Sequence, residues 1–225
     1  MASSAKASCL LVISAKEGVP AQSFIHAFTL CHSAFSVQLA SPDRKPIDFI
    51  EQDESSKRWL NEFKSKPFST PVKLDTIDAT RYSALLLIDC PGALYDLAHN
   101  QDLAQILQHF KSQTKPVCAI GMGVAALCCD KDVNTPGAKW AYSGYSLTAP
   151  SVYELARSPT FSNLPIILED YIKDNGATYS ASVVDAVHVV VDRHLITGQN
   201  EMSTLTAVQN LILLCNAKQG KAGVK

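Results

Sequence analysis

The chain has 225 residues, of which 47% are hydrophobic and 18% charged, and its formal net charge at pH 7 is −1. This near-neutral balance, without a long basic run, gives no electrostatic reason to expect direct binding of nucleic acid or of an anionic membrane. The five consecutive apolar residues at 9–13 are too few for a signal-peptide core or a membrane span. We therefore expect a cytoplasmic protein without membrane insertion.

Short apolar runs alternate along the chain with segments of helical spacing. The runs predict buried parallel strands at residues 9–14, 35–40, 84–88 and 116–120. Helical spacing predicts helices near residues 21–32, 55–63, 103–110 and 208–214, the last before a polar, frayed tail at about 217–225. A hairpin is predicted with its turn at residues 192–193 and its return strand at 195–197. This alternation is typical of one α/β domain, residues 1–225, with a mostly parallel central sheet.

Ligand sites in such sheets gather at the carboxyl ends of the strands. The segments to search are therefore 14–20, 88–94 and 119–127, each of which follows a predicted strand. The seven cysteines include no C-x-x-C pair, so nothing indicates a metal site, and no cofactor motif is found. Buried free thiols in a reducing compartment are the simplest interpretation.

Three blocks of sequence carry a resemblance to a known family. They are ALYDLAHNQDLAQILQHFKSQTKPVCAIGMGVAAL at 93–127, LEDYIKDNGATYSAS at 168–182 and HVVVDRHLITGQN at 188–200. Together they resemble the class I glutamine amidotransferase-like, or PfpI-type, superfamily, nearest to the branch that contains stress-induced glyoxalase-chaperones. The resemblance covers residues 9–215 and implies a flavodoxin-like three-layer sandwich.

The resemblance also implies where a nucleophile should lie. In that superfamily a cysteine stands at a strand-to-helix elbow, where the helix N-terminus lowers its pKa. In this chain Gly121 occupies the nucleophile position, Met122 the next one, and Gly123 keeps the turn. Neither glycine nor methionine can replace a thiolate or a general base. The chain therefore resembles a member whose catalytic chemistry has been lost.

Two further positions bear on the site that the resemblance implies. The usual oxyanion-hole loop is replaced by Asp89-Cys90-Pro91-Gly92, in which Pro91 has no N–H and Asp89 adds negative charge. Glu17 matches the acidic residue that the superfamily places beside its cysteine, although a solvated loop residue is the alternative. We thus expect a vestigial pocket of Glu17, Cys90, Gly121 and Met122, with no catalytic residue.

The remaining thiols admit less reactive interpretations. Cys90 is either a relocated nucleophile or an inert buried thiol, and burial is the commoner state of cysteine. Cys118 falls within a predicted strand and should face the core. Cys128 and Cys129 follow two turns into the elbow helix, away from its activating N-terminus, so we expect both to be packing residues.

The histidines and caps near the C-terminus are also best explained structurally. His188 should be a hydrogen-bonded, partly buried residue, and His194, in a turn, should be solvated. Glu169 and Asp170 should begin a helix, since carboxylates stabilise helix N-termini. The segment 197–200 should cap the final helix through Thr197 or Asn200.

Several functions stay open at this level. A retained fold with a dismantled site favours a subunit or adaptor that works through protein contacts, including self-association into a homo-oligomer. The resemblance implies an early-endosomal effector assembly that links Rab-type GTPases to mRNA transport, with a peripheral location at endosomes. The alternative is a hydrolase, glyoxalase or deglycase that uses Cys90 with Glu17. A sensor that binds a small molecule in the leftover pocket is a third possibility.

Overall fold

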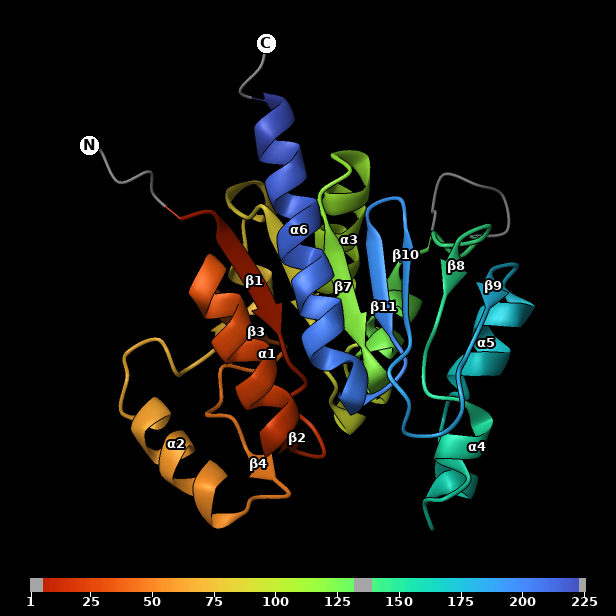
Figure 1. The fold of residues 1–225 in the computed structure, drawn as a ribbon, viewed down its shortest axis with the longest axis horizontal. Helices are drawn as coiled ribbons and strands as arrows, with labels where there is room; N and C mark the ends of the chain where they lie inside the picture. The colour runs from red at the N-terminus through yellow and green to blue at the C-terminus, as the bar shows by residue number, and fades with distance from the viewer. Residues whose placement is uncertain (1–5, 132–138, 223–225) are drawn as a thin grey trace.

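The computed structural model describes residues 6–131 and 139–222, and its elements follow one another as Figure 1 shows. The strands are β1 (Ser8–Val12), β2 (Val19–Pro20), β3 (Ser36–Ser41), β4 (Phe49–Ile50), β5 (Val72–Lys73), β6 (Ala84–Leu87), β7 (Val117–Ile120), β8 (Ser146–Leu147), β9 (Thr178–Tyr179), β10 (Val189–Asp192) and β11 (Leu195–Gly198). The α-helices are α1 (Ala21–Ala34), α2 (Glu54–Lys64), α3 (Gln101–Ser112), α4 (Val152–Leu155), α5 (Leu168–Asp174) and α6 (Thr204–Ala222). The 3-10 helices are η1 (Leu74–Thr76), η2 (Ala79–Arg81), η3 (Pro91–Leu94), η4 (Gly121–Cys129), η5 (Phe161–Asn163) and η6 (Glu201–Ser203).

Seven strands form a central sheet in the order β10-β11-β7-β6-β1-β3-β5. The pairs within it are parallel, except for the antiparallel hairpin of β10 and β11. The four strands predicted from the apolar runs are confirmed as β1, β3, β6 and β7, and the hairpin is confirmed as well. Runs such as Ala84–Leu87 are apolar at every position because both faces of the sheet are covered. The architecture is the flavodoxin-like α/β fold.

Helices lie on both sides of this sheet. In Figure 1, α1 and α6 pack side by side in front of the strands, and α3 lies behind them. Helices α1 and α3 begin where the sequence provides a suitable residue: Pro20 precedes α1, and the Asn100 side chain accepts the Leu103 N–H at the start of α3, at 2.8 Å. The helices predicted at 21–32 and 103–110 are confirmed, and both are longer than predicted, at Ala21–Ala34 and Gln101–Ser112.

Residues 41–80 leave the sheet and return to it through α2. The helix begins at a capping box in which Asp53 accepts the Ser56 N–H. Its inner face brings Trp59 and Phe63 against α1, and the ring of Phe63 lies 5.0 Å from that of Phe24, edge to face. The helix predicted at 55–63 is thus confirmed, and aromatic packing holds this excursion to the rest of the molecule.

The C-terminal end differs from the expectation. The tail was predicted to be frayed from residue 217, and this was wrong: α6 continues through it as far as Ala222. Residues 217–222 contain one glycine and no proline, so little in their composition stops a helix that tertiary packing has already nucleated. Residues 132–138 and 223–225 lie outside the described part of the chain.

Candidate functional site

The elbow after β7 has the backbone geometry that the sequence predicts. β7 ends at Ile120, η4 begins at Gly121, and the φ angle of Gly121 is +54°. Only glycine adopts this left-handed conformation without steric cost. The prediction that Gly121 occupies a strained turn between strand and helix is confirmed, and the helix behind it is of the 3-10 type.

A carboxylate from the neighbouring strand fills the space beside this glycine. A Cβ added to Gly121 would lie 2.4 Å from both Cγ and Oδ1 of Asp89, which follows β6. The N–H of Met122 donates a hydrogen bond to Asp89 Oδ1 at 2.8 Å. Asp89 therefore occupies the position into which a side chain at residue 121 would project, and it also takes up the first N–H behind the elbow.

The environment of Asp89 is unfavourable to negative charge. Burial raises the pKa of Asp89 to about 7, the Met122 N–H opposes this rise, and the charges of Glu201, Glu51 and Glu154 add to it. At neutral pH the group is therefore close to its midpoint of titration. A titratable group in this state, in a cleft, is a candidate functional residue.

The cleft above Asp89 has a volume of about 660 Å³ and is rich in carboxylates. It is lined by Glu51, Asp89, Met122, Pro150, Glu154, Leu155, Arg157, Ser158, Asp185 and Asn200. Glu154 Oε1 accepts the Asn200 amide at 2.7 Å, and Arg157 pairs with Asp185 at 2.6 Å. The cleft thus brings together Met122 of the predicted pocket and Asp89, whose role the sequence analysis treated only as added charge.

Glu17 lies elsewhere. It is exposed, its backbone is left-handed with φ +58°, and it lines a separate cavity of about 160 Å³ beside Lys16 and Lys45. The loop before it is held by Asp96, which accepts the Ala15 N–H at 2.7 Å. The structure therefore places Glu17 outside the cleft that contains Asp89 and Met122.

Cys90 is separated from solvent. Its side chain is fully buried, and its thiol lies 3.4 Å from the Ile88 carbonyl oxygen. Burial, together with the smaller effect of the nearby carboxyl groups of Asp89 and Asp96, raises the pKa of Cys90 to about 12. A thiol in this state stays protonated at neutral pH, whereas a nucleophilic cysteine needs a lowered pKa.

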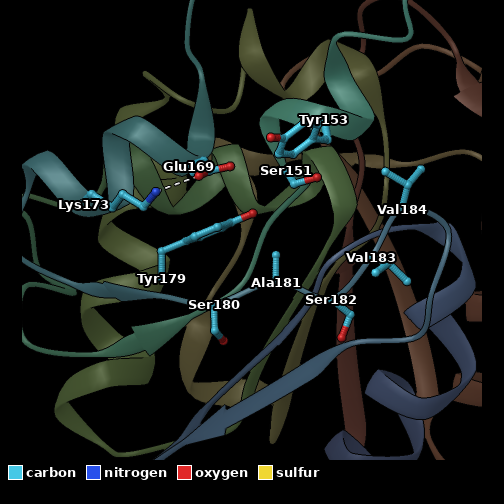
Figure 2. A pocket seen from close by; sticks show the side chains of 10 residues that line it. All are labelled: Ser151, Tyr153, Glu169, Lys173, Tyr179, Ser180, Ala181, Ser182, Val183 and Val184. Atoms are coloured by element: carbon cyan, nitrogen blue, oxygen red, sulfur yellow. Dashed lines mark hydrogen bonds and ion pairs between the residues drawn. The ribbon is translucent and has the colours of Figure 1, made fainter.

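Another cavity, of about 580 Å³, opens between α4, α5 and the segment after β9 (Figure 2). Its charged groups satisfy each other, since Lys173 pairs with Glu169 at 2.6 Å and lies over the ring of Tyr179. The Tyr179 hydroxyl donates to the Ala149 carbonyl at 3.1 Å. Figure 2 shows mainly hydroxyl, aromatic and valine side chains around the opening, so this cavity offers surface without an activated group.

Comparison with known proteins identifies the family. No family model matches the chain. A curated Xenopus laevis protein, "glutamine amidotransferase-like class 1 domain-containing protein 1", is 58% identical over 95% of this chain and 93% of its own length. The Danio rerio protein of the same name is 59% identical over 94% of this chain and 98% of its own length. The chain belongs to this family.

Solved structures of other proteins share the fold of this chain at low sequence identity. Glyoxalase III from Candida albicans superposes with a TM-score of 0.80 at 18% identity, covering 92% of this chain and 96% of that one. Drosophila melanogaster DJ-1beta superposes with a TM-score of 0.60 at 16% identity, covering 92% of this chain and 89% of that one. These neighbours establish the flavodoxin-like fold that the resemblance implied.

The remaining thiols of this family member are structural, as predicted. Cys118 is fully buried in β7, and Cys128 and Cys129 are buried in η4. Burial raises the pKa of each above its ordinary value. Among the described residues, no group of three or more histidine, cysteine, aspartate or glutamate side chains could hold a metal ion. Within the same ranges, no helix combines the length and apolar character that crossing a membrane requires.

Polar residues near the C-terminus follow the predictions, with one exception. His188 is hydrogen-bonded to the hydroxyls of Ser180 and Ser182, and Asn200 accepts the Ser203 N–H at the start of η6. His194 was expected to be solvated, and this was wrong. Its ring packs edge to face on Tyr145, and burial lowers its pKa to about 4. A turn in sequence does not reveal that a neighbouring aromatic residue covers it.

The sequence carried a signal for Asp89 that the motif comparison did not use. β6 and β7 are neighbouring parallel strands, so the residues that follow them meet at one edge of the sheet. A glycine after one strand leaves a space that a carboxylate after the other can fill. The pairing of these strands was needed before this could be inferred.

Proposed function

We propose that this protein is a catalytically silent member of its family that acts through protein contacts, as a subunit or adaptor of a multi-protein assembly. The observation that carries the proposal is the Asp89 carboxylate, which occupies the space beside Gly121 where a nucleophilic side chain would project. The elbow keeps its backbone turn, and a neighbouring residue has taken the place of its reactive group.

The charge around the elbow also opposes the chemistry of the superfamily. An elbow cysteine needs N–H donors that stabilise a thiolate and a developing oxyanion. Here the Met122 N–H is already bound to Asp89, and Pro91 offers no N–H. Glu51 and Glu154 add further negative potential in the cleft. These features favour a binding role over acyl transfer or glyoxalase chemistry.

The family resemblance suggests which assembly this subunit serves. It implies an early-endosomal effector of Rab-type GTPases that takes part in mRNA transport. The protein would then lie in the cytoplasm and at the endosomal surface without membrane insertion. Its net charge of −1 leaves contact with RNA to other subunits. Self-association into a homo-oligomer would allow it to present its partner surface more than once.

Activity measurements test the first part of the proposal. Purified protein should convert neither methylglyoxal nor small ester and amide substrates above a heat-denatured control. Removing a covalent nucleophile costs on the order of 10⁶ in rate in a hydrolase triad. Turnover by the wild type that Cys90→Ser or Glu17→Gln abolishes would overturn the proposal in favour of an enzyme that uses Cys90 with Glu17.

A second experiment tests the assembly itself. Protein tagged at its native locus should co-sediment with early-endosomal membranes, and a salt wash should release it as a complex that contains a Rab-type GTPase effector and mRNA. Recovery of the tagged protein only in fractions free of endosomal membrane and of that effector would contradict the assignment, whatever the activity assay shows.

A further inference from the structure

The cleft beside the elbow holds more negative charge than its own residues neutralise. Among the described residues, four carboxylates and one cation, Arg157, line it. Arg157 is paired with Asp185 at 2.6 Å. The other three carboxylates, those of Glu51, Asp89 and Glu154, form no ion pair within the part of the chain that the structure describes. A cationic group from outside the chain would balance this charge.

Asp89 has a carboxylate oxygen left over for such a group. Its Oδ1 accepts the Met122 N–H at 2.8 Å, whereas its Oδ2 has no hydrogen-bond partner in the described ranges of the chain. The carboxyl group is buried and lines the cleft. An ionised oxygen that is buried without a partner carries a desolvation cost, which a donor entering the cleft would remove.

The other two carboxylates differ in how far they are already used. Glu154 Oε1 accepts the Asn200 amide at 2.7 Å and the Asp185 N–H at 3.2 Å, so this side chain is held in place by its own neighbours. Glu51, on the loop between β4 and α2, is exposed and accepts no hydrogen bond from a described residue. Glu51 and Asp89 are therefore the two groups that can bind a cation, and Glu154 contributes its charge.

The rest of the lining selects the kind of cation. Met122, Pro150 and Leu155 give the same cleft an apolar wall. Lysine and arginine side chains bury their methylene stems along apolar surface while the charged end reaches a polar partner. A bare metal ion would gain nothing from such a wall, and no cluster among the described residues could hold one. The cleft thus matches a cation that is carried on an aliphatic stem.

We propose that this cleft is the docking site for a lysine or arginine side chain of a protein partner, with the charged end at Asp89 Oδ2 and the stem along Met122 and Leu155. The inference rests on the proposed function, because it names the chemistry that a partner brings to the elbow. It gives Asp89 a second role: the carboxylate that fills the place of a nucleophile is also the anchor for the partner.

The proposed contact depends on pH, because a cation needs Asp89 in its ionised form. Burial raises the pKa of Asp89 to about 7. The charged groups that line the cleft or act on Asp89 from neighbouring elements are Glu51, Glu154, Arg157, Asp185 and Glu201. The ionised fraction of a group with this pKa rises about tenfold from pH 6 to pH 8, and the affinity for a cation should rise by the same factor.

A titration followed by NMR on ¹⁵N-labelled protein tests the contact. The probes are the Nα-acetyl methylamides of arginine and lysine, with that of citrulline as the neutral control of the same shape as arginine. The two cationic probes should shift the Met122 amide signal, and the citrulline probe should bind at least about tenfold more weakly. Asp89→Asn should weaken binding of the cationic probes at least about tenfold and remove its pH dependence. The matched control Glu17→Gln removes a carboxylate outside the cleft and should change neither.

The outcomes separate this inference from its alternatives. Equal affinity for the arginine and citrulline probes, or unchanged affinity in Asp89→Asn, would overturn it. Spermidine offers the same charge without a protein, and binding of spermidine at least about 30-fold tighter than that of both cationic probes would overturn the protein source in favour of a free polyamine. Turnover by the wild type would contradict catalytic silence and leave cation binding in place, whereas loss of cation binding would leave catalytic silence in place.

The assembly provides the second readout. Asp89→Asn, tagged at the native locus, should be recovered with the endosomal complex in a yield at least about fivefold lower than the wild type, and Glu17→Gln in an unchanged yield. Full recovery of Asp89→Asn with the complex would show that the partner does not dock through this cleft.

Discussion

Two carboxylates follow neighbouring strands of the same sheet, and they differ in exposure and in the charge of their surroundings. Glu17, after β1, is exposed and lines a small cavity beside lysines. Asp89, after β6, lies against Gly121 in a cleft of like charges, and its pKa is raised to about 7. The sequence motif drew attention to Glu17, whereas packing gave the altered chemistry to Asp89. A position after a strand places a residue at the edge of the sheet where ligand sites gather. The neighbours of that residue in space then determine its burial and its pKa.

The largest expected effect concerns the space that Asp89 fills. Gly121→Ala should lower the free energy of unfolding by about 2–5 kcal/mol, from the left-handed backbone and from overlap with the carboxylate. Gly144→Ala is the matched control, because Gly144 has φ +76° with no atom within 4 Å of an added Cβ. It should cost only about 1–2 kcal/mol. Urea unfolding monitored by fluorescence measures both.

The same experiment can separate the two causes. Adding Asp89→Ala to Gly121→Ala removes the overlap but not the backbone strain. The double variant should therefore lose less than the sum of the two single variants, with a coupling of about 1–3 kcal/mol. Strict additivity would show that Asp89 does not occupy the position beside residue 121. A thiol introduced as Gly121→Cys should likewise be accommodated only when Asp89 is shortened.

The next effect is a pH dependence of opposite sign to ordinary acid denaturation. Asp89 titrates near 3.9 in the unfolded chain and near 7 in the folded one, so the folded state binds more protons between these values. Stability from this group is present at about pH 4 and is lost as pH rises to 7, by roughly 2–4 kcal/mol. Asp89→Asn should remove that slope and be more stable than the wild type at pH 8. Equal slopes in both proteins between pH 4 and 8 would contradict the raised pKa.

His194 provides the contrary case, a buried base away from the cleft. Its pKa is lowered to about 4 by burial and then by the positive charges of Lys218, Lys111 and Arg193. The unfolded chain binds more protons between about pH 4 and 6.5, so the free energy of unfolding should fall by roughly 2–3 kcal/mol as pH drops through this window. His194→Phe keeps the packing on Tyr145 and should abolish the fall. Unfolding curves of the wild type and of His194→Phe at pH 7 and pH 5 measure this difference.

The smallest effect is expected at Glu17. Glu17→Gln should change the free energy of unfolding by less than about 0.5 kcal/mol, because the side chain is exposed. A change in the free energy of unfolding as large as that caused by Asp89→Asn would mean that Glu17 shares the cleft. The contrast between the two carboxylates would then disappear.

The sequence supported the main features of the fold because they rest on local patterns. Four strands, the hairpin, α1 to α3 and the elbow at Gly121 follow from apolar runs, helical spacing and the special backbone freedom of glycine. Outside the candidate site, two predictions failed because the deciding contacts are distant in sequence. His194 is covered by Tyr145, which lies on another segment, and the end of α6 is helical because packing against α1 and the sheet stabilises the turns before it.

For the candidate site, the sequence by itself determined what is missing: Gly121 and Met122 carry no nucleophile, and Pro91 carries no N–H. It determined this because the absence of a chemical group is a property of one residue. Only the tertiary structure decided what stands in that place, since the environment of Asp89 comes from β6, β7, α4 and η6 together. Burial, like charge and the space beside a glycine are properties of neighbours in space, and these are fixed only when the strands pair.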